Sequence, residues 1–447
     1  MVVISFPGAT VTGDVVGVTR TGSGDTVVIT STAENVNYVL QGITTNGSVK
    51  FYSDKPAAVY FNGVGITNPS GAPINIQSKQ QFDITLVDGT QNRLIDGAAY
   101  SFTENEDMKG AFFSEAPLEI NGTGRLEIIA KYRHGIATDK NLYIKSGDIA
   151  IHTSSNAYWD ADDKEVSASA GFKPKTALVI DGGTIAIRAT GSGGKGINCG
   201  GDITITNGKL TIVTSGNLYA ENGDDTAAKA IKGDGNVTVT GGTIKLKTTG
   251  TEAEGLESKD TLLISGGDLT IIVVDDCINA ANHIEITGGT MYCVSSSNDA
   301  FDSNGTLTIT GGTIRAFGGT NGEDGFDCDN NTFKITGGTL IGIGGRTSTP
   351  TSSVCTQPTV IYQMSGKPGE ISIKDSSGTV LQSFTLPVTY NTPCLFFSDP
   401  ALKIGGTYTI YADGTAGAPL SISQMVTSTA TGGGNRPPPG PGKRTVW

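Results

Sequence analysis

The amino-acid sequence predicts an all-β protein, a right-handed parallel β-helix with a small antiparallel cap near its C-terminal end. Three observations lead to this prediction. A phrase of two short strands joined by a glycine pair recurs along the chain, and apolar residues alternate within each strand. Glycine makes up 63 of the 447 residues, while aromatic residues make up only 7%. Abundant Thr, Ile, Val, Gly and Asn favour strands and turns over helices.

The repeated phrase sets the length of one coil. Its plainest copies are VTVTGGTI at 237–244, LLISGGDL at 262–269, IEITGGTM at 284–291, LTITGGTI at 307–314 and FKITGGTL at 333–340. The second glycines of the turns fall at positions 183, 208, 242, 267, 289, 312 and 338, so most steps are 22–26 residues. A period of this length, made from short strands, is typical of one coil of a parallel β-helix.

Alternation within the strands indicates which side chains face the core. Leu307 and Ile309 precede one turn, and Ile314 and Ala316 follow it. Because the side-chain period of a strand is two, these residues share one inward face. The glycine pair is expected to form a corner with positive φ, which a Cβ atom would obstruct.

The rhythm of the strands divides the chain into four segments. We expect residues 1–132 to form an N-terminal cap and irregular first coils, and residues 133–350 to form the regular β-helix. The hairpin-like sequence after residue 370 predicts an antiparallel β cap over residues 351–425. The Gly- and Pro-rich residues 426–447 are interpreted as a low-complexity tail.

Composition excludes several classes of protein. The chain has 31 basic and 43 acidic residues, a net charge of −12 and a pI near 4.8, which argues against a sequence-independent nucleic-acid binder. No run approaches the ~18 apolar residues of a membrane helix. Residues 1–7 lack a basic n-region, so we expect either an intracellular protein or a mature chain whose leader has been removed. The six cysteines never form a CxxC motif and are expected to be free thiols or core residues.

An acidic ladder is the main chemical signal. We align the coils on the apolar residue that follows each Asp/Gly corner, which is Ile231, Leu256, Ile278, Phe301 or Phe326. Two positions earlier stand Lys229, Glu254, Asp276, Asp299 and Asp324. One position later stand Lys232, Glu257, Asn279, Asp302 and Asp327, and three positions later stand Asp234, Lys259, Ala281, Asn304 and Asp329. Equivalent side chains of neighbouring coils stack at ~4.8 Å.

Such columns need a counterion. Two carboxylates at that separation repel by about 1 kcal/mol in water and by several times more in a partly buried site. Calcium takes 6–8 oxygen ligands at roughly 2.3–2.6 Å, so oxygens on opposite sides of one ion lie about 5 Å apart. The sequence therefore predicts calcium ligands at Glu254, Glu257, Asp276, Asn279, Asp299, Asp302, Asp324, Asp327 and Asp329. A solvated acidic face is the alternative, although turn propensity alone does not explain the two glutamates.

Several segments outside the repeat carry a family resemblance. They are GSVKFYSDK at 47–55, NGVGITN at 62–68, APINIQSK at 72–79, EDMKGAFFSE at 106–115 and FFSDPALK at 396–403. Over about residues 35–415 the chain resembles the calcium-bearing, pectate-lyase-like bacterial family of carbohydrate-binding β-helix proteins. The resemblance implies a secreted or cell-surface protein that binds plant-type polysaccharide, with calcium on the acidic ladder. In the family the ladder continues into earlier coils, where this chain has His134, Ala170, Lys195 and Lys229.

Three hypotheses for function follow. The first is calcium-dependent binding of a plant cell-wall polysaccharide, either pectin (polygalacturonate) or cellulose, by a monomeric protein without nucleic-acid partners. The second is a polysaccharide (pectate) lyase that uses calcium-assisted β-elimination, for which Lys229, Lys232 and Lys259 are the candidate bases. The third is a structural or adhesive surface protein. Tyr158 and Trp159, inside the insertion at 152–172, are candidates for stacking on sugar rings; no catalytic residue is assigned for the binding hypothesis.

Overall fold

The computed structural model describes residues 1–103 and 106–430, and every regular element in them is a β-strand. Part of the expected tail, 431–447, therefore lies outside the described residues. No helix in the described part of the chain is long and apolar enough to span a membrane. The chain forms two compact units, Met1–Asp275 and Asp276–Trp447.

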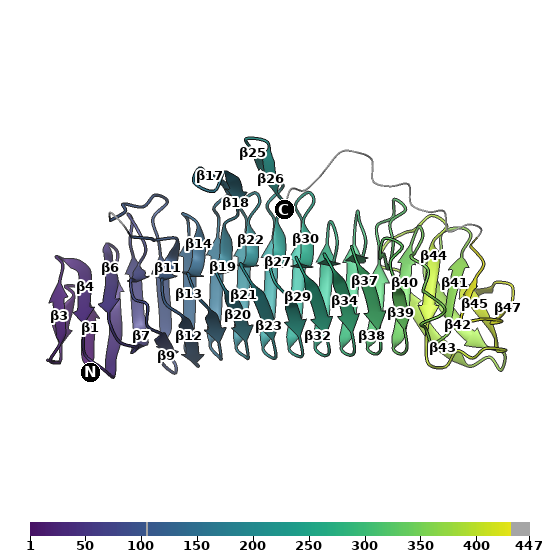
Figure 1. Cartoon of the computed structure of the whole chain (residues 1–447), viewed down its shortest axis with the longest axis horizontal. Helices are drawn as coiled ribbons and strands as arrows, with labels where there is room; N and C mark the ends of the chain where they lie inside the picture. The colour runs from purple at the N-terminus through teal and green to yellow at the C-terminus, as the bar shows by residue number, and fades with distance from the viewer. Residues whose placement is uncertain (104–105, 431–447) are drawn as a thin grey trace. The chain divides into compact units, whose positions relative to one another are not determined.

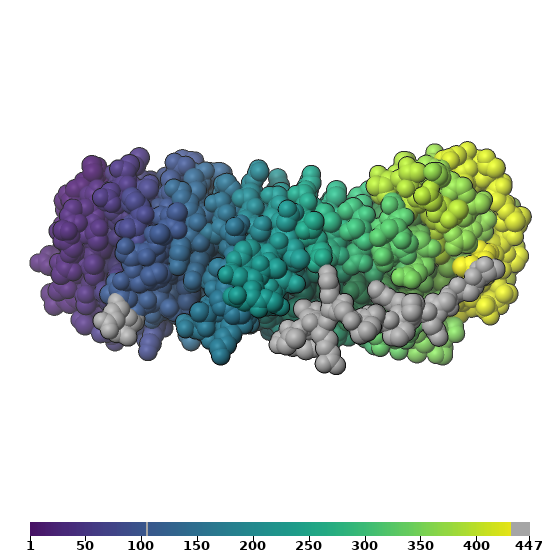
Figure 2. Space-filling model, turned by 90° about the horizontal axis from the view of Figure 1, so that it is seen from above, coloured from purple at the N-terminus to yellow at the C-terminus, as the bar shows by residue number. Residues whose placement is uncertain are grey.

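The first unit is a stack of coils, each built from three strands (Figure 1). Strands at the same place in successive coils pair in parallel, which produces three rows of strands. Figure 2 shows the coils of this unit as successive bands in chain order, from purple to teal. The prediction of an all-β, parallel solenoid is confirmed, whereas its right-handed sense stays a prediction.

The strands of the first unit have the following bounds. The first row contains β9 (Phe82–Leu86), β12 (Leu118–Gly122), β15 (Leu142–Ile144), β20 (Ala177–Ile180), β23 (Asp202–Ile205), β28 (Val237–Val239) and β31 (Thr261–Ile264). The second row contains β10 (Gln91–Ile95), β13 (Arg125–Ala130), β16 (Asp148–Thr153), β21 (Thr184–Ala189), β24 (Lys209–Thr214), β29 (Thr243–Thr248) and β32 (Asp268–Val273). The third row contains β4 (Asp25–Ser31), β6 (Gly47–Ser53), β8 (Ile74–Ile76), β11 (Gly110–Ser114), β14 (His134–Thr138), β19 (Ala170–Pro174), β22 (Lys195–Cys199), β27 (Lys229–Gly233) and β30 (Glu254–Ser258). The long strands β5 (Val36–Thr44) and β7 (Ala57–Thr67) precede these strands in the first two rows.

The N-terminal coils are more regular than the sequence suggested. Among the described residues before the first insertion, only two pairs of strands are antiparallel, and both lie at the very start. They are β1 (Val2–Phe6) with β2 (Thr10–Thr12), and β3 (Val18–Thr21) with β4. Parallel pairing already begins at β1 with β5, and continues at β4 with β6 and at β5 with β7. The double-glycine turn is thus one way to close a coil, and these coils close without it.

Inward side chains form continuous apolar columns. On the second row the register aligns Leu126, Ile149, Ile185, Leu210, Ile244 and Leu269, all of which are buried. On the third row Ile197, Ile231 and Leu256 are aligned and buried in the same way. Each strand therefore places alternate residues in the core, as the period of two predicted.

Two hairpins project from the stack at the insertions (Figure 1). They are β17 (Tyr158–Asp160) with β18 (Glu165–Ser167), and β25 (Tyr219–Glu221) with β26 (Asp224–Thr226). Each precedes a third-row strand, so the insertions lengthen one corner without disturbing the rows.

The second unit continues the same construction within its own bounds. Its third row contains β33 (Ile278–Ala280) and β36 (Phe301–Ser303), its first row β34 (His283–Ile286), β37 (Thr306–Ile309) and β39 (Phe333–Ile335), and its second row β35 (Thr290–Ser295), β38 (Thr313–Phe317) and β40 (Thr339–Gly344). Beyond them, β44 (Cys394–Ser398) pairs antiparallel with β40 and with β41 (Thr359–Gln363). A short strand, β48 (Val426–Ser428), pairs with β41 at the start of the segment that was expected to be tail.

The antiparallel sheet lies where the cap was expected. It contains β42 (Glu370–Asp375), β43 (Val380–Thr385), β45 (Thr407–Ala412), β46 (Thr415–Ala416) and β47 (Leu420–Ser421). Ile371, Phe384 and Leu402 share an apolar cluster with Phe317 and Ile343 of the last coils. This cluster covers coils that would otherwise expose apolar surface. All six cysteines are buried, and none of them forms a disulfide bond.

The glycine corners have the predicted conformation. The last glycine of each turn, which follows Asn207 at position 208 and a glycine at the others, has a positive φ, between 86° and 101° at positions 183, 208, 242, 267, 289, 312 and 338. The first glycine is needed for a different reason. A Cβ atom on Gly311 would lie 2.3 Å from the carbonyl oxygen of Thr287 in the neighbouring coil.

Gly311→Ala should therefore lower the free energy of unfolding by about 1–3 kcal/mol, because the backbone must shift to admit the methyl group. Urea denaturation followed by circular dichroism measures the loss. Gly369→Ala is the matched control, since a Cβ there meets one side-chain oxygen at 3.4 Å. Equal losses in the two variants would contradict the steric explanation.

Candidate metal centre

The charged columns lie on the third-row strands, in the register that the sequence predicted. In the first unit Lys229 stands opposite Glu254, and Lys232 stands opposite Glu257. In the second unit Asn279 stands opposite Asp302, which in turn forms a bridge with Asp327.

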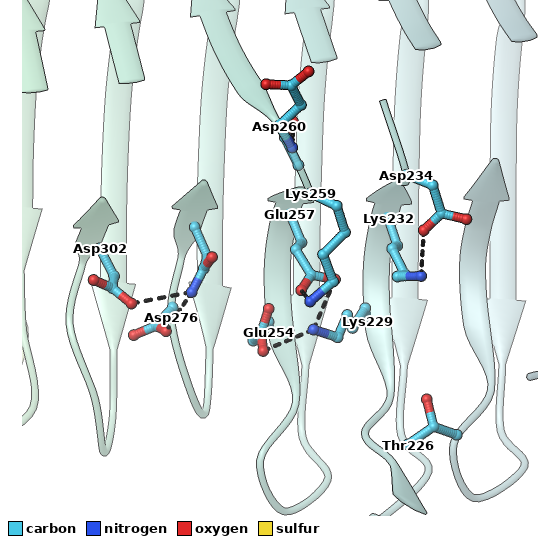
Figure 3. A network of polar contacts seen from close by, with 12 residues as sticks. Thr226, Lys229, Lys232, Asp234, Glu254, Glu257, Lys259, Asp260, Asp276 and Asp302 are labelled. Atoms are coloured by element: carbon cyan, nitrogen blue, oxygen red, sulfur yellow. Dashed lines mark hydrogen bonds and ion pairs between the residues drawn. The ribbon is translucent and has the colours of Figure 1, made fainter. Parts of the chain in front are cut away.

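Lysines form ion pairs with the two glutamates of the first unit (Figure 3). Lys229 Nζ lies 2.8 Å from Glu254 Oε1 and 2.7 Å from Glu257 Oε2. A second lysine, Lys259, places its Nζ 2.7 Å from Glu257 Oε1. Burial alone would raise the pKa of Glu257, but the two ammonium groups hold that pKa below its ordinary value.

The lysines that are candidate bases are all engaged in ion pairs. Burial opposes the charge of Lys229, yet the carboxylates of Glu254 and Glu257 hold its pKa above the ordinary value. Lys232 Nζ lies 2.5 Å from Asp234 Oδ1, and Lys259 is held by Glu257. These amines are donors to carboxylates, whereas a general base must be unprotonated and within reach of substrate.

One coil earlier, the column holds a lysine without an acidic partner in contact. Lys195 is 2% exposed, and its Nζ donates to Thr226 Oγ1 at 2.7 Å. Burial and the charge of Lys229 hold the pKa of Lys195 well below its ordinary value.

Three aspartates come together in the second unit. Candidate ligand oxygens of Asp299, Asp302 and Asp327 all lie within 4.8 Å of one another. The side chains of Asp299 and Asp327 are buried, and that of Asp302 is half-buried. Their separation matches oxygens that share one calcium ion.

Hydrogen bonds from neighbouring coils fix these carboxylates. The Asp299 amide donates to Asp276 Oδ1 at 3.0 Å, and the Asp324 amide donates to Asp299 Oδ1 at 2.5 Å. At Asp327, Oδ1 accepts from the Cys328 amide and from Ser348 Oγ, both at 2.8 Å. The oxygens are therefore held in place before any ligand arrives, which lowers the entropy cost of binding.

Burial raises the free energy of the ionised carboxylates in this cluster. Burial and the nearby Asp324 carboxylate raise the pKa of Asp299 to about 9. The pKa of Asp324 is raised to about 7 by burial and by Asp327, even though Arg346 opposes the rise. Arg346 Nε lies 3.0 Å from Asp324 Oδ1. A divalent cation would supply the positive charge that Asp299 lacks.

The other predicted ligands lie around this cluster. The amide nitrogen of Asn279 donates to Asp276 Oδ2 at 3.2 Å and to Asp302 Oδ2 at 3.1 Å. Rotation of that amide by half a turn would instead present Asn279 Oδ1. Asp329 is exposed on the next turn, where its backbone amide donates to Asp327 Oδ1 at 3.2 Å.

Sequence reasoning missed the contributions of Arg346 and Ser348. Both follow β40 and lie outside the repeated phrase, so no alignment of coils places them beside the ladder. The candidate sugar-stacking residues lie elsewhere, on the hairpin strand β17. Tyr158 is already covered by Arg133, whose Cζ lies 3.9 Å from the ring centroid. Trp159 is half-buried on the same strand.

In a calcium-free buffer the unfolding free energy should fall as pH rises from about 5 to about 9. A carboxyl group whose pKa is raised by folding stabilises the folded state below its ordinary pKa of ~3.9, and that contribution is lost as the pH passes the raised values of Asp324 and Asp299. Urea titrations in EGTA at several pH values measure the slope.

Asp299→Asn should flatten this slope, whereas the exposed control Asp162→Asn should not. Saturating calcium should restore stability above pH 7, because only the ionised carboxylates bind it. An Asp299→Asn protein with the slope of the wild type would contradict the assignment.

Lys229→Met should cost about 3–5 kcal/mol of unfolding free energy, because it leaves two buried carboxylates without their shared cation. Lys232→Met is the control. It breaks a partly exposed pair with Asp234 and should cost about 1 kcal/mol or less. Thermal and urea unfolding at pH 7 measure the loss of unfolding free energy in both variants. Similar losses would show that the ion pairs of Lys229 stabilise the fold no more than the ion pair of Lys232.

Comparisons with known proteins agree on a carbohydrate-binding family. The family model described as carbohydrate-binding domain-containing protein matches residues 23–299 and 245–385. A relative of the same description from Acetivibrio thermocellus is 33% identical over 118 residues, which are 26% of this chain and 41% of the relative. The match thus spans less than half the length of that relative.

The chain is also similar to a solved structure. A polysaccharide lyase-like protein from C. thermocellum, determined as a gadolinium derivative, aligns with 69% of this chain and 96% of its own at 23% identity and a TM-score of 0.39. The family assignment comes from the sequence matches, which cover most of the coils described above. The chain belongs to the family of carbohydrate-binding domain-containing proteins.

Proposed function

We propose that this protein binds an anionic plant cell-wall polysaccharide, such as polygalacturonate, in a calcium-dependent manner. Membership of a carbohydrate-binding family supports the polysaccharide ligand. The observation that carries the calcium dependence is the cluster of Asp299, Asp302 and Asp327, whose ligand oxygens lie within 4.8 Å of one another.

Calcium belongs at these aspartates and not at the two glutamates of the first unit. Glu254 and Glu257 already have lysine counterions within 2.8 Å. Burial raises the pKa of Glu254 to about 7 despite Lys229, whereas burial and the neighbouring carboxylates raise the pKa of Asp299 further, to about 9. Asp276, Asn279 and Asp324 would complete or orient the shell, and Asp302 is the most accessible of the three central ligands.

An acidic polysaccharide suits a calcium ion on an acidic protein. The protein carries a net charge of −12, so direct approach of a polyanion is unfavourable. Calcium accepts up to eight oxygens, and uronate carboxylates could fill the positions that the protein leaves open. Secretion or display at the cell surface as a monomer, and the right-handed sense of the coil, belong to the same proposal.

Lyase activity is the competing function, and the ion pairs argue against it. Each candidate base, Lys229, Lys232 or Lys259, lies within 2.8 Å of a carboxylate. An adhesive role without glycan specificity is the remaining alternative.

Retention on insoluble polygalacturonate tests the proposal. The wild type should be retained in millimolar calcium and released by EGTA. Asp302→Asn should weaken calcium-dependent retention by roughly tenfold, the equivalent of 1.4 kcal/mol. Asp163→Asn, which removes an exposed carboxylate on the hairpin loop, is the matched control.

The absorbance of unsaturated products, recorded on the same samples, separates binding from cleavage. We expect no product in calcium. Product that forms with the wild type and disappears with Lys232→Ala would replace binding by lyase activity. Retention that is equal in calcium and EGTA would contradict calcium dependence.

A further inference from the structure

The outward face of the second row carries an unusual patch of positive charge. Arg188 on β21, Lys209 on β24 and Lys245 and Lys247 on β29 all point outward and are exposed. These three neighbouring strands contain no acidic residue, although the whole chain has 43 acidic and 31 basic residues. We call these four side chains the cationic face.

The cationic face is not neutralised by the protein. None of its four side chains has a hydrogen bond or ion pair with any other described residue. On the preceding strands the basic side chains are paired with acidic ones. Arg125 Nη1 lies 2.7 Å from Asp148 Oδ2, and Arg93 Nε lies 2.7 Å from Glu127 Oε2. The acidic partners stop where the cationic face begins, so an outside anion is the available counterion.

A trough adjoins this face. Its volume is about 290 Å³. Ala150 and Ala186 stand opposite each other in it, and His152 and Arg188 stand opposite each other along one side. Glu127, which forms an ion pair with Arg93, also lines the trough and stands opposite Ala150. Thr211 and Val213 of β24 continue the two columns toward Lys245 and Lys247. Two neighbouring alanines therefore leave room for a ligand that lies across the strands.

We propose that the cationic face and its trough bind an extended anionic polysaccharide across β16, β21, β24 and β29. This inference rests on the proposed function and adds a second surface to it. Arg188 can hold a carboxylate through two parallel hydrogen bonds, and the lysines act as point charges farther along the chain of sugars. In the column of Arg188, Val213 separates it from Lys247, so these two cations lie about two strand spacings, roughly 9.6 Å, apart, while Lys209 stands in the column of Thr184.

The residue types favour an acidic glycan over other ligands. The four strands contain no Phe, Tyr or Trp, so the surface lacks the rings on which nucleic-acid bases stack. It also lacks an aromatic platform for a neutral sugar. Charge is the remaining means of recognition, and the interaction should be sensitive to salt and independent of calcium.

Binding of soluble polygalacturonate fragments in EGTA, measured by calorimetry at low and high salt, tests the inference. The wild type should bind at low salt and lose most of that binding at high salt. The double variant Arg188→Glu/Lys245→Glu should bind at least tenfold more weakly at low salt. The double control Lys334→Glu/Lys164→Glu makes the same change in net charge away from the face and should reduce binding less than threefold.

A second variant separates shape from charge. Ala186→Trp fills the trough without changing the charge and should also weaken binding by several fold, while Thr238→Trp on the outward face of β28 should not. Both tryptophans replace side chains outside the core, and circular dichroism checks that the fold is intact. If neither the charge reversal nor Ala186→Trp weakens binding more than its control, the inference is wrong.

These binding measurements distinguish the cationic face from the calcium site. Loss of EGTA-resistant binding in the face variants, with calcium-dependent retention intact, supports the cationic face. Wild-type protein that binds only in calcium overturns the inference but leaves the proposed function standing. Equal EGTA-resistant binding to neutral cellulose fragments, or binding of single-stranded DNA in place of polygalacturonate, also overturns it.

Discussion

Stacking of equivalent residues at one strand spacing is the constraint on which the rest of the structure depends. In a solenoid of parallel strands, the side chain at a given position meets its counterpart in the next coil at ~4.8 Å. Apolar columns gain from this repetition, as in the aligned Ile and Leu residues of the second row. A column of carboxylates does not, because each addition repels its neighbours. The chemistry of the protein follows from how each unit compensates the repulsion between its stacked carboxylates.

The two units compensate the repulsion between carboxylates in different ways. In the first, Lys229 bridges Glu254 and Glu257, so the countercharge is covalently part of the chain. In the second, Arg346 reaches Asp324, while Asp299 keeps a strongly raised pKa. A lysine supplies the countercharge from within the chain, whereas an aspartate cluster leaves the countercharge to an exchangeable ion. Only the second arrangement can couple stability to a ligand from solution.

Much of this was accessible from the sequence because the repeat carries the register. Once one coil was aligned with the next, the pairings of Glu254 with Lys229 and of Asp302 with Asn279 followed directly. Coils before residue 132 were predicted, but as irregular ones, since they lack the glycine turn that marked the others. Arg346 and Ser348 were missed because they come from a non-repeating segment. Nor could a periodic pattern show that Lys229 contacts both glutamates, which depends on a side-chain conformation.

Diffraction data from crystals grown in millimolar calcium, collected where calcium scatters anomalously, test the central claim most directly. The account predicts an anomalous peak among the carboxylates of Asp299, Asp302 and Asp327, with metal–oxygen distances of about 2.3–2.6 Å, and no such peak beside Glu254 and Glu257. A map with only water among the three aspartates, or with the ion beside the two glutamates, would contradict it.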